Sequence, residues 1–146
     1  MSKREGKKHK PLRIALAVLG IVFGVLVVVS LAALAITEGE RREGRELPIA
    51  DVDFSALPDG TYHGSYEGGR YGWRANAVEV TVSGGKVTQI EVVKSATPPT
   101  LALTERLFAQ VIAEQTLQVD AYSGATITSK AFLKSVEDAL TSGSGP

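Results

Sequence analysis

The stretch V-D-A-Y-S-G-A-T-I-T-S-K-A-F-L-K-S-V-E-D-A-L, residues 119–140, decides how the rest of the chain is interpreted. It opens with a short apolar and polar run and passes through a turn of small residues at 123–126. Apolar residues then recur at helical spacing, which predicts an amphipathic helix that begins near Thr128. Its apolar face consists of Phe132, Leu133, Val136, Ala139 and Leu140. The pattern predicts a strand, a tight turn and a helix start.

Hydroxyl residues gather where the turn meets this helix. Thr126, Thr128 and Ser129 would lie beside backbone N–H groups without an intrahelical partner, at the positive end of the helix dipole. Such a place favours an anion, typically a phosphate. Serine and threonine also cap many helices and glycine forms many tight turns, so these residues alone are compatible with a simple cap.

The frame around the turn is more specific. Asp120, two further residues and Ser123-Gly124-Ala125-Thr126 resemble the D-x-x-[S/T]-G-A-T signature of the FMN-binding domain family. That family includes subunits of bacterial sodium-pumping and related electron-transport complexes. The resemblance extends back through D-G-T-Y-H-G-S-Y at residues 59–66 and the hairpin that follows.

The resemblance implies a covalent cofactor. In that family a flavin transferase joins FMN, through its phosphate, to the hydroxyl of the last threonine, here Thr126. It implies that Ser123, Gly124 and Ala125 form the turn that presents this hydroxyl and that the transferase recognises Asp120. The remaining phosphate charge would then lie near Thr128, at the helix N-terminus.

Composition excludes several other kinds of site. The 146 residues have zero net charge, but residues 1–13 carry +5 and the remainder −5, so the acidic body argues against a nucleic-acid partner. The chain has no cysteine, which excludes disulfides, thiol catalysis and cysteine-ligated metals. His9 and His63 are the only histidines and stand apart, so we predict no metal site.

An uncharged apolar run covers residues 14–36. As a helix it would be about 34 Å long, enough to cross a hydrocarbon core with some tilt. The basic residues before it predict a cytoplasmic N-terminus and an extracytoplasmic C-terminal domain. The resemblance implies that the membrane is a bacterial cell membrane. Ala33-Leu34-Ala35 also has the form of a signal-peptidase site, but the run exceeds the usual h-region, which favours an uncleaved anchor.

The sequence therefore divides into five parts. A basic N-terminus at 1–13 and the transmembrane helix at 14–36 come first. Residues 37–58 are predicted to be a hydrated linker, with a short helix at 40–46 left open. An FMN-binding domain at 59–140 and a frayed tail at 141–146 follow.

Alternating residues predict the sheet of this domain. Residues 61–66 read as a strand, residues 67–74 as a glycine-rich loop with aromatics and arginines, and residues 75–93 as a hairpin. Aromatic side chains in and before the loop could flank a flavin ring, but each is individually expected to be structural (Tyr62, His63, Tyr71, Trp73). A three-residue loop at 84–86, with a bulge, would pair Val80 with Ile90 and Val78 with Val92 on the inner face.

A second helix should follow Pro98-Pro99, with Thr100 as its cap. Its apolar stripe is Leu103, Leu107, Phe108, Val111 and Ile112. Residues 116–119 would lead back to the turn as a strand or extended segment. The fold class is therefore α+β, with a small antiparallel sheet covered on one face by two helices and preceded by a transmembrane helix.

We expect an electron carrier from these features. The sequence has no Ser-His-Asp arrangement, paired carboxylates or P-loop, whereas a flavin brings its own redox chemistry. The expected partners are the flavin transferase, the membrane, and a membrane-associated electron donor or acceptor. A noncatalytic envelope-binding module and a flavin-dependent reductase component remain alternatives.

Overall fold

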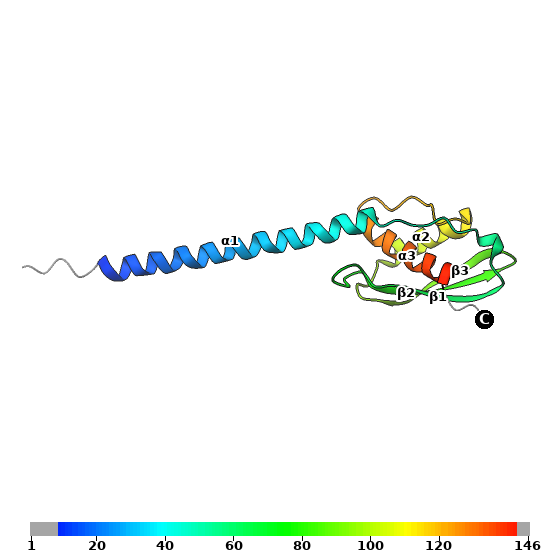
Figure 1. Ribbon diagram of the computed structural model, residues 1–146, viewed down its shortest axis with the longest axis horizontal. Helices are drawn as coiled ribbons and strands as arrows, with labels where there is room; N and C mark the ends of the chain where they lie inside the picture. Colours follow the sequence, from blue (N-terminus) through cyan, green and yellow to red (C-terminus); the bar gives the residue numbers. More distant parts are fainter. Residues whose placement is uncertain (1–8, 143–146) are drawn as a thin grey trace, which may run out of the picture. The chain divides into compact units, whose positions relative to one another are not determined.

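The computed structural model describes residues 9–142. The predictions for residues 1–8 of the basic N-terminus and for residues 143–146 of the tail therefore lie outside it. The chain divides after Gly39 into two compact units. The second unit holds three strands and two helices, the α+β arrangement that the sequence predicts (Figure 1).

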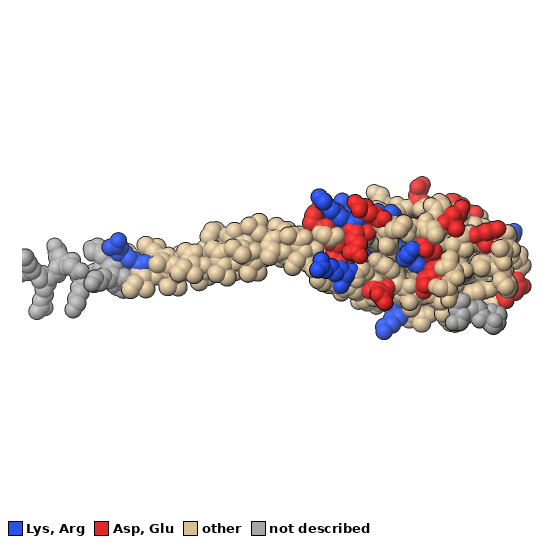
Figure 2. Space-filling model, in the orientation of Figure 1, with Lys and Arg blue, Asp and Glu red and all other residues tan. Residues whose placement is uncertain are grey.

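Helix α1 (His9–Glu46) is longer than the predicted span of 14–36. Its apolar part leaves large side chains exposed throughout, and it is long and apolar enough to span a membrane. Figure 2 shows no charged side chain along this stretch. The helix does not stop at Ile36 but continues through residues 40–46, so the short helix left open in the sequence is present as its last turns.

The sheet consists of β1 (Gly60–Tyr66), β2 (Asn76–Ser83) and β3 (Lys86–Ser95), antiparallel and in that order. In β2 every second side chain faces inward, because valines alternate with polar residues and strand side chains point alternately to opposite faces. The inward valines, Val78, Val80 and Val82, are at most 2 % exposed.

For the hairpin between β2 and β3, the predicted inward pairs are confirmed but the predicted loop length is wrong. Val80 pairs with Ile90 and Val78 with Val92, as predicted. However, Ser83 pairs with Lys86, so the loop has two residues, Gly84 and Gly85, both with positive φ. A register shift beyond Thr81 absorbs one residue of β3 and restores the inward pairing, which is the effect of a β-bulge.

Helices α2 (Leu101–Glu114) and α3 (Thr126–Ser142) cover one face of the sheet (Figure 1). α3 contacts β1 and β2, and α2 contacts β3. The predicted apolar face of α3 is buried in full, as is the stripe of α2 except for the half-buried Ile112. Thr100 occupies the cap position of α2 without a side-chain hydrogen bond. Residues 116–119 form no strand, and Thr116 and Leu117 lie in a bend.

The segment predicted as a hydrated linker packs against the domain instead. Phe54, in the 3-10 turn Phe54–Ala56, is 3 % exposed and belongs to the core. The buried Glu137 carboxylate of α3 accepts the Ala50 N–H at 2.9 Å. Lys130 of α3 donates to the Leu47 carbonyl at 3.2 Å. The sequence did not indicate this packing, because the apolar residues of the segment are isolated and follow no helical or strand periodicity.

Candidate functional site

The small-residue turn is held in place from both sides. The Ala125 N–H donates to the Tyr122 carbonyl at 2.9 Å, and Gly124 between them has φ +84°, which only glycine adopts freely. The Tyr122 N–H donates to the fully buried Ser129 hydroxyl at 3.4 Å. The Tyr122 hydroxyl accepts a hydrogen bond from Arg106 of α2. The turn is therefore fixed to both helices.

Thr126 is the first residue of α3, two residues before the predicted start. The Ser129 N–H donates to the Ala125 carbonyl at 2.9 Å, which is the first hydrogen bond of the helix. The N–H groups of residues 126–128 therefore precede any intrahelical acceptor and remain available to a ligand. Thr126 is half-buried, whereas Asp120, Ser123 and Gly124 are exposed.

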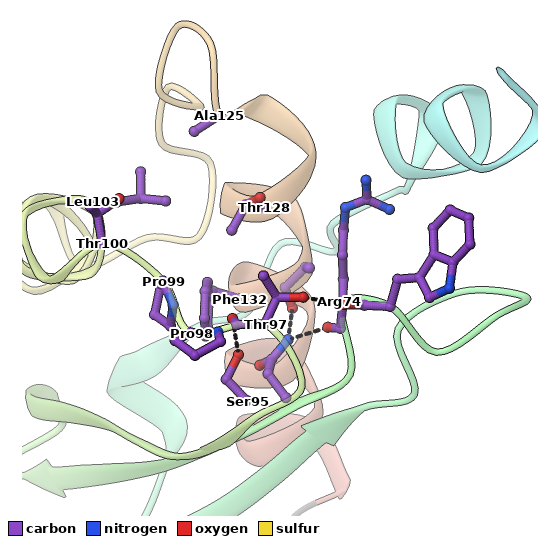
Figure 3. Close-up of a pocket in the computed structure, with 13 residues that line it drawn as sticks. Arg74, Ser95, Thr97, Pro98, Pro99, Thr100, Leu103, Ala125, Thr128 and Phe132 are labelled. Atoms are coloured by element: carbon purple, nitrogen blue, oxygen red, sulfur yellow. Dashed lines mark hydrogen bonds between the residues drawn. The ribbon is translucent and has the colours of Figure 1, made fainter. Parts of the chain in front are cut away.

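A cavity of about 300 Å³ lies beside this helix start. Figure 3 shows Leu103 of α2 and the cap residue Thr100 on one side, Thr128 of α3 and the preceding Ala125 on the other, and Thr97 and Pro98 below. Of the residues predicted for the site, Ala125 and Thr128 line the cavity, while Asp120, Ser123, Gly124 and Thr126 do not. The complete lining is Trp73, Arg74, Asn76, Ser95, Thr97, Pro98, Pro99, Thr100, Leu103, Ala125, Thr128, Ala131 and Phe132.

Asn76 is the polar residue of this lining that the sequence analysis missed. Its side-chain nitrogen donates to the carbonyls of Arg74 at 3.0 Å and Ala131 at 3.2 Å, and these two bonds fix the orientation of the amide. Its Oδ1 is buried and has no hydrogen-bond partner. The signal was available, because Asn76 stands two residues before Val78, in the inward register of β2.

The loop between β1 and β2 forms the rim of the cavity. Trp73 lines it and stacks on Tyr71, which does not. The two other residues considered as flavin neighbours lie elsewhere. Tyr62 is buried in the core and its hydroxyl donates to the Pro58 carbonyl at 2.8 Å, while His63 is exposed and pairs with Glu79 at 3.6 Å.

The last turns of α1 hold the same loop. Glu40, only 4 % exposed, accepts the Tyr71 N–H at 3.0 Å and pairs with Arg74 at 3.5 Å. Gly44 packs so closely against α3 that a Cβ there would overlap the Ile127 side chain. Arg74, which lines the cavity, is therefore also paired with the end of α1.

A tyrosine beside this ion pair predicts sensitivity to alkaline pH. Burial raises the pKa of Tyr66, and the carboxylates of Glu43 and Glu40 raise it further against the opposing effect of Arg74. A raised pKa means that the folded state keeps the proton that the unfolded state loses. Its contribution to stability is therefore present below about pH 10 and is lost as the pH rises through the folded pKa.

Tyr66→Phe should accordingly lose less stability than the wild type between about pH 9 and pH 11, because it has no phenol to ionise. Urea unfolding at both pH values measures the difference, with Tyr71→Phe as the control at an exposed ring. Equal losses in Tyr66→Phe and the wild type would contradict the prediction.

Comparison with known proteins agrees with the geometry. The model of the FMN-binding domain family matches residues 72–141, which include every residue that lines the cavity. No curated protein and no solved structure matches the chain significantly. The family that the D-x-x-S-G-A-T frame indicated is thereby confirmed. Residues 72–141 form a domain of the FMN-binding family, in a chain whose N-terminal helix is long and apolar enough to span a membrane.

Proposed function

We propose that the chain is a membrane-anchored, extracytoplasmic flavoprotein that carries electrons through FMN attached by a phosphoester to Thr126. The observation that carries the proposal is the position of Thr126, at the first residue of α3 beside the cavity of an FMN-binding domain. Ala125 and Thr128, on either side of it in the sequence, both line that cavity.

The cavity residues fit a flavin. Pro98, Pro99, Leu103 and Phe132 supply apolar walls, as ligand sites of this size usually have. The buried, unpaired Oδ1 of Asn76 is an acceptor of the kind that a flavin ring N–H satisfies. Leaving such an acceptor unpaired costs about 1–3 kcal/mol, so pairing favours the bound state.

The start of α3 fits the phosphate. The free N–H groups of residues 126–128 and the helix dipole stabilise the one negative charge that a phosphodiester retains. In the attachment, the Thr126 oxygen loses its proton and bonds to phosphorus, while the transferase's activated flavin nucleotide releases its other phosphate-containing half. Ser123, Gly124 and Asp120 are exposed, as residues that a transferase must recognise need to be.

The lining also favours a carrier over a substrate-converting enzyme. FMN supplies one- or two-electron redox chemistry when bound. Among the described residues of the lining, Arg74 is the only one with an ionisable side chain, and arginine does not exchange protons near neutral pH. The residues of this lining therefore offer no general acid or base. A reductase that protonates its organic acceptor through a protein side chain would need such a group.

Membrane anchoring rests on helix α1. Its exposed apolar side chains would be unstable in water over such a length, and its composition suits a hydrocarbon core. The basic residues that precede it favour a cytoplasmic N-terminus, which places the flavin domain outside. Covalent attachment suits that compartment, because a dissociable cofactor would be diluted and lost.

Co-expression with a flavin transferase tests the proposal. The full chain should show flavin fluorescence on a denaturing gel when the transferase is present and none when it is absent. It should also remain in the membrane after alkaline carbonate extraction. Full expression with the transferase but no fluorescent band would contradict covalent attachment and favour a noncatalytic module, whereas release by carbonate would contradict only the anchor.

A further inference from the structure

Two exposed aromatic rings lie on the loop between β1 and β2. Tyr71 and Trp73 stack with their ring centroids 5.3 Å apart, yet each remains 45 % exposed. The Arg70 guanidinium lies 5.8 Å from the centre of the Tyr71 ring. We refer to Arg70, Tyr71 and Trp73 as the aromatic patch. Exposed apolar rings bordered by a cation are typical of a contact surface.

The patch is fastened to the end of helix α1. Glu40 accepts the Tyr71 N–H at 3.0 Å and pairs with Arg74 at 3.5 Å. Gly69, with φ +79°, lets the loop backbone pass close to the same carboxylate: a Cβ there would lie 3.2 Å from its Oε2. The position of the patch is therefore tied to that of Glu40.

The chain itself limits how far Glu40 can be from the hydrocarbon core. Glu40 follows Ile36, the last residue of the apolar run, by four positions in a continuous helix. Four residues of helix span about 6 Å. The polar headgroup layer on each side of a bilayer is about 5–7 Å thick, so Glu40 and the loop bonded to it fall at this layer.

We propose that the aromatic patch docks onto the phospholipid headgroup layer of the membrane that α1 spans. Tyr71 and Trp73 enter the interface, where such rings are favoured, and Arg70 pairs with lipid phosphates. The exposed Arg41 and Arg42 add cations at the same level. This inference rests on the proposed anchoring, and it gives the domain a second membrane contact that limits its rotation about the anchor.

The alternative occupant is the flavin ring, since Trp73 also lines the cavity. Lipid is favoured because the patch extends beyond the cavity: Tyr71 and Arg70 are not part of the lining, and both are exposed. A flavin in the cavity would explain the exposure of Trp73 alone. The headgroup layer of a membrane explains the exposure of both rings and of Arg70.

Trp73 is the only tryptophan of the chain, so its fluorescence reports on the patch alone. The full chain, produced without a transferase so that no flavin quenches the signal, is reconstituted into phosphatidylcholine–phosphatidylglycerol vesicles. Lipids brominated on the acyl chain near the headgroup should reduce Trp73 emission at least about twofold, as expected for an interfacial ring. Acrylamide in the water should quench it less than it quenches N-acetyltryptophanamide.

A matched variant carries its tryptophan elsewhere. Trp73→Phe combined with Gln89→Trp moves the reporter to an exposed position of β3. The part of the chain next to Trp73 is Thr97, whose hydroxyl donates to the Trp73 carbonyl, and Gln89 lies eight residues before it. The strand from Gln89 to Ser95 spans about 20 Å, so brominated lipid should leave its emission almost unchanged. Equal quenching in the two proteins would overturn the proposal, because it would report general proximity to lipid.

The remaining outcomes separate the explanations. A chain that resists carbonate extraction but whose Trp73 is not quenched by brominated lipid would overturn the docking and leave the anchor intact. Release of the chain by carbonate would contradict the anchor and, with it, the docking proposal. If Trp73→Phe instead changes the visible circular dichroism of the flavin-loaded chain while lipid quenching is absent, the ring contacts the flavin and the proposal is wrong.

Discussion

Replacing Thr126 with valine should abolish covalently bound flavin entirely, whereas Thr128→Val should retain it. Valine keeps the β-branched shape of threonine but lacks the oxygen that would bond to phosphorus. Thr126 is half-buried at the first position of α3, where most residues are tolerated, so its replacement should leave the fold intact. The measurement is in-gel flavin fluorescence after co-expression with the transferase, supported by the mass of the peptide that contains residue 126.

The neighbouring threonine makes this test selective. Thr128 lies in the same helical turn, is half-buried like Thr126 and lines the cavity, so a general disturbance of the helix start would affect both variants. Equal loss of fluorescence in two folded variants would mean that the attachment point is misplaced. A fluorescent band that persists in Thr126→Val would rule out Thr126 as the attachment point.

The sequence predicts the elements of the domain well because each has a strong periodic signal. Valine alternation defines β2, and the apolar spacing of α3 identifies all five of its predicted core residues. The predicted length of the hairpin loop is wrong because a two-residue loop with a bulge and a three-residue loop produce the same inward pairs. Periodicity specifies which residues face inward, but it does not locate the residue that is skipped.

The site was only partly predictable for a different reason. The turn at 123–126 is contiguous in the sequence, so a motif reveals it, and Ala125 and Thr128 do reach the cavity. Arg74 joins it from a distant loop that no local pattern links to the turn. The inward register of β2 indicates that Asn76 faces the core, but not that it reaches this cavity. In the sequence, Glu40 is one more charge of the predicted linker. In the structure it is buried and bonded to Tyr71 and Arg74, about thirty positions further along the chain.

A glycine in β1 shows how much of the packing has no sequence signal. Gly64 lies in the strand directly beneath α3, and a Cβ there would overlap the Ala139 nitrogen and the Ser135 carbonyl oxygen. It would also come within 2.6 Å of the Ala139 Cα. These are backbone atoms of a helix, which cannot rotate aside as a side chain can. The close approach of β1 and α3 therefore requires that residue 64 has no side chain.

Gly64→Ala should destabilise the domain by about 3 kcal/mol or more, at or above the upper end for overpacking, because strand and helix must separate. For a domain of this size, the expected fall in melting temperature is at least about 12 °C. Thermal unfolding followed by circular dichroism measures it. Adding Ala139→Gly should not restore stability, because the overlap is with the backbone and not with the Ala139 methyl group.

Gly39→Ala is the matched control. Gly39 lies in helix α1 with open space around it, so the same added methyl group meets nothing. Alanine is favoured over glycine within a helix by about 0.5–1 kcal/mol, so this variant should be as stable as the wild type or slightly more so. If Gly64→Ala melts within a few degrees of Gly39→Ala, β1 and α3 are less closely packed than described. In that case the position of α3 on the sheet would have to be revised. The position of Thr126 beside the cavity would change with it, because Thr126 is the first residue of that helix.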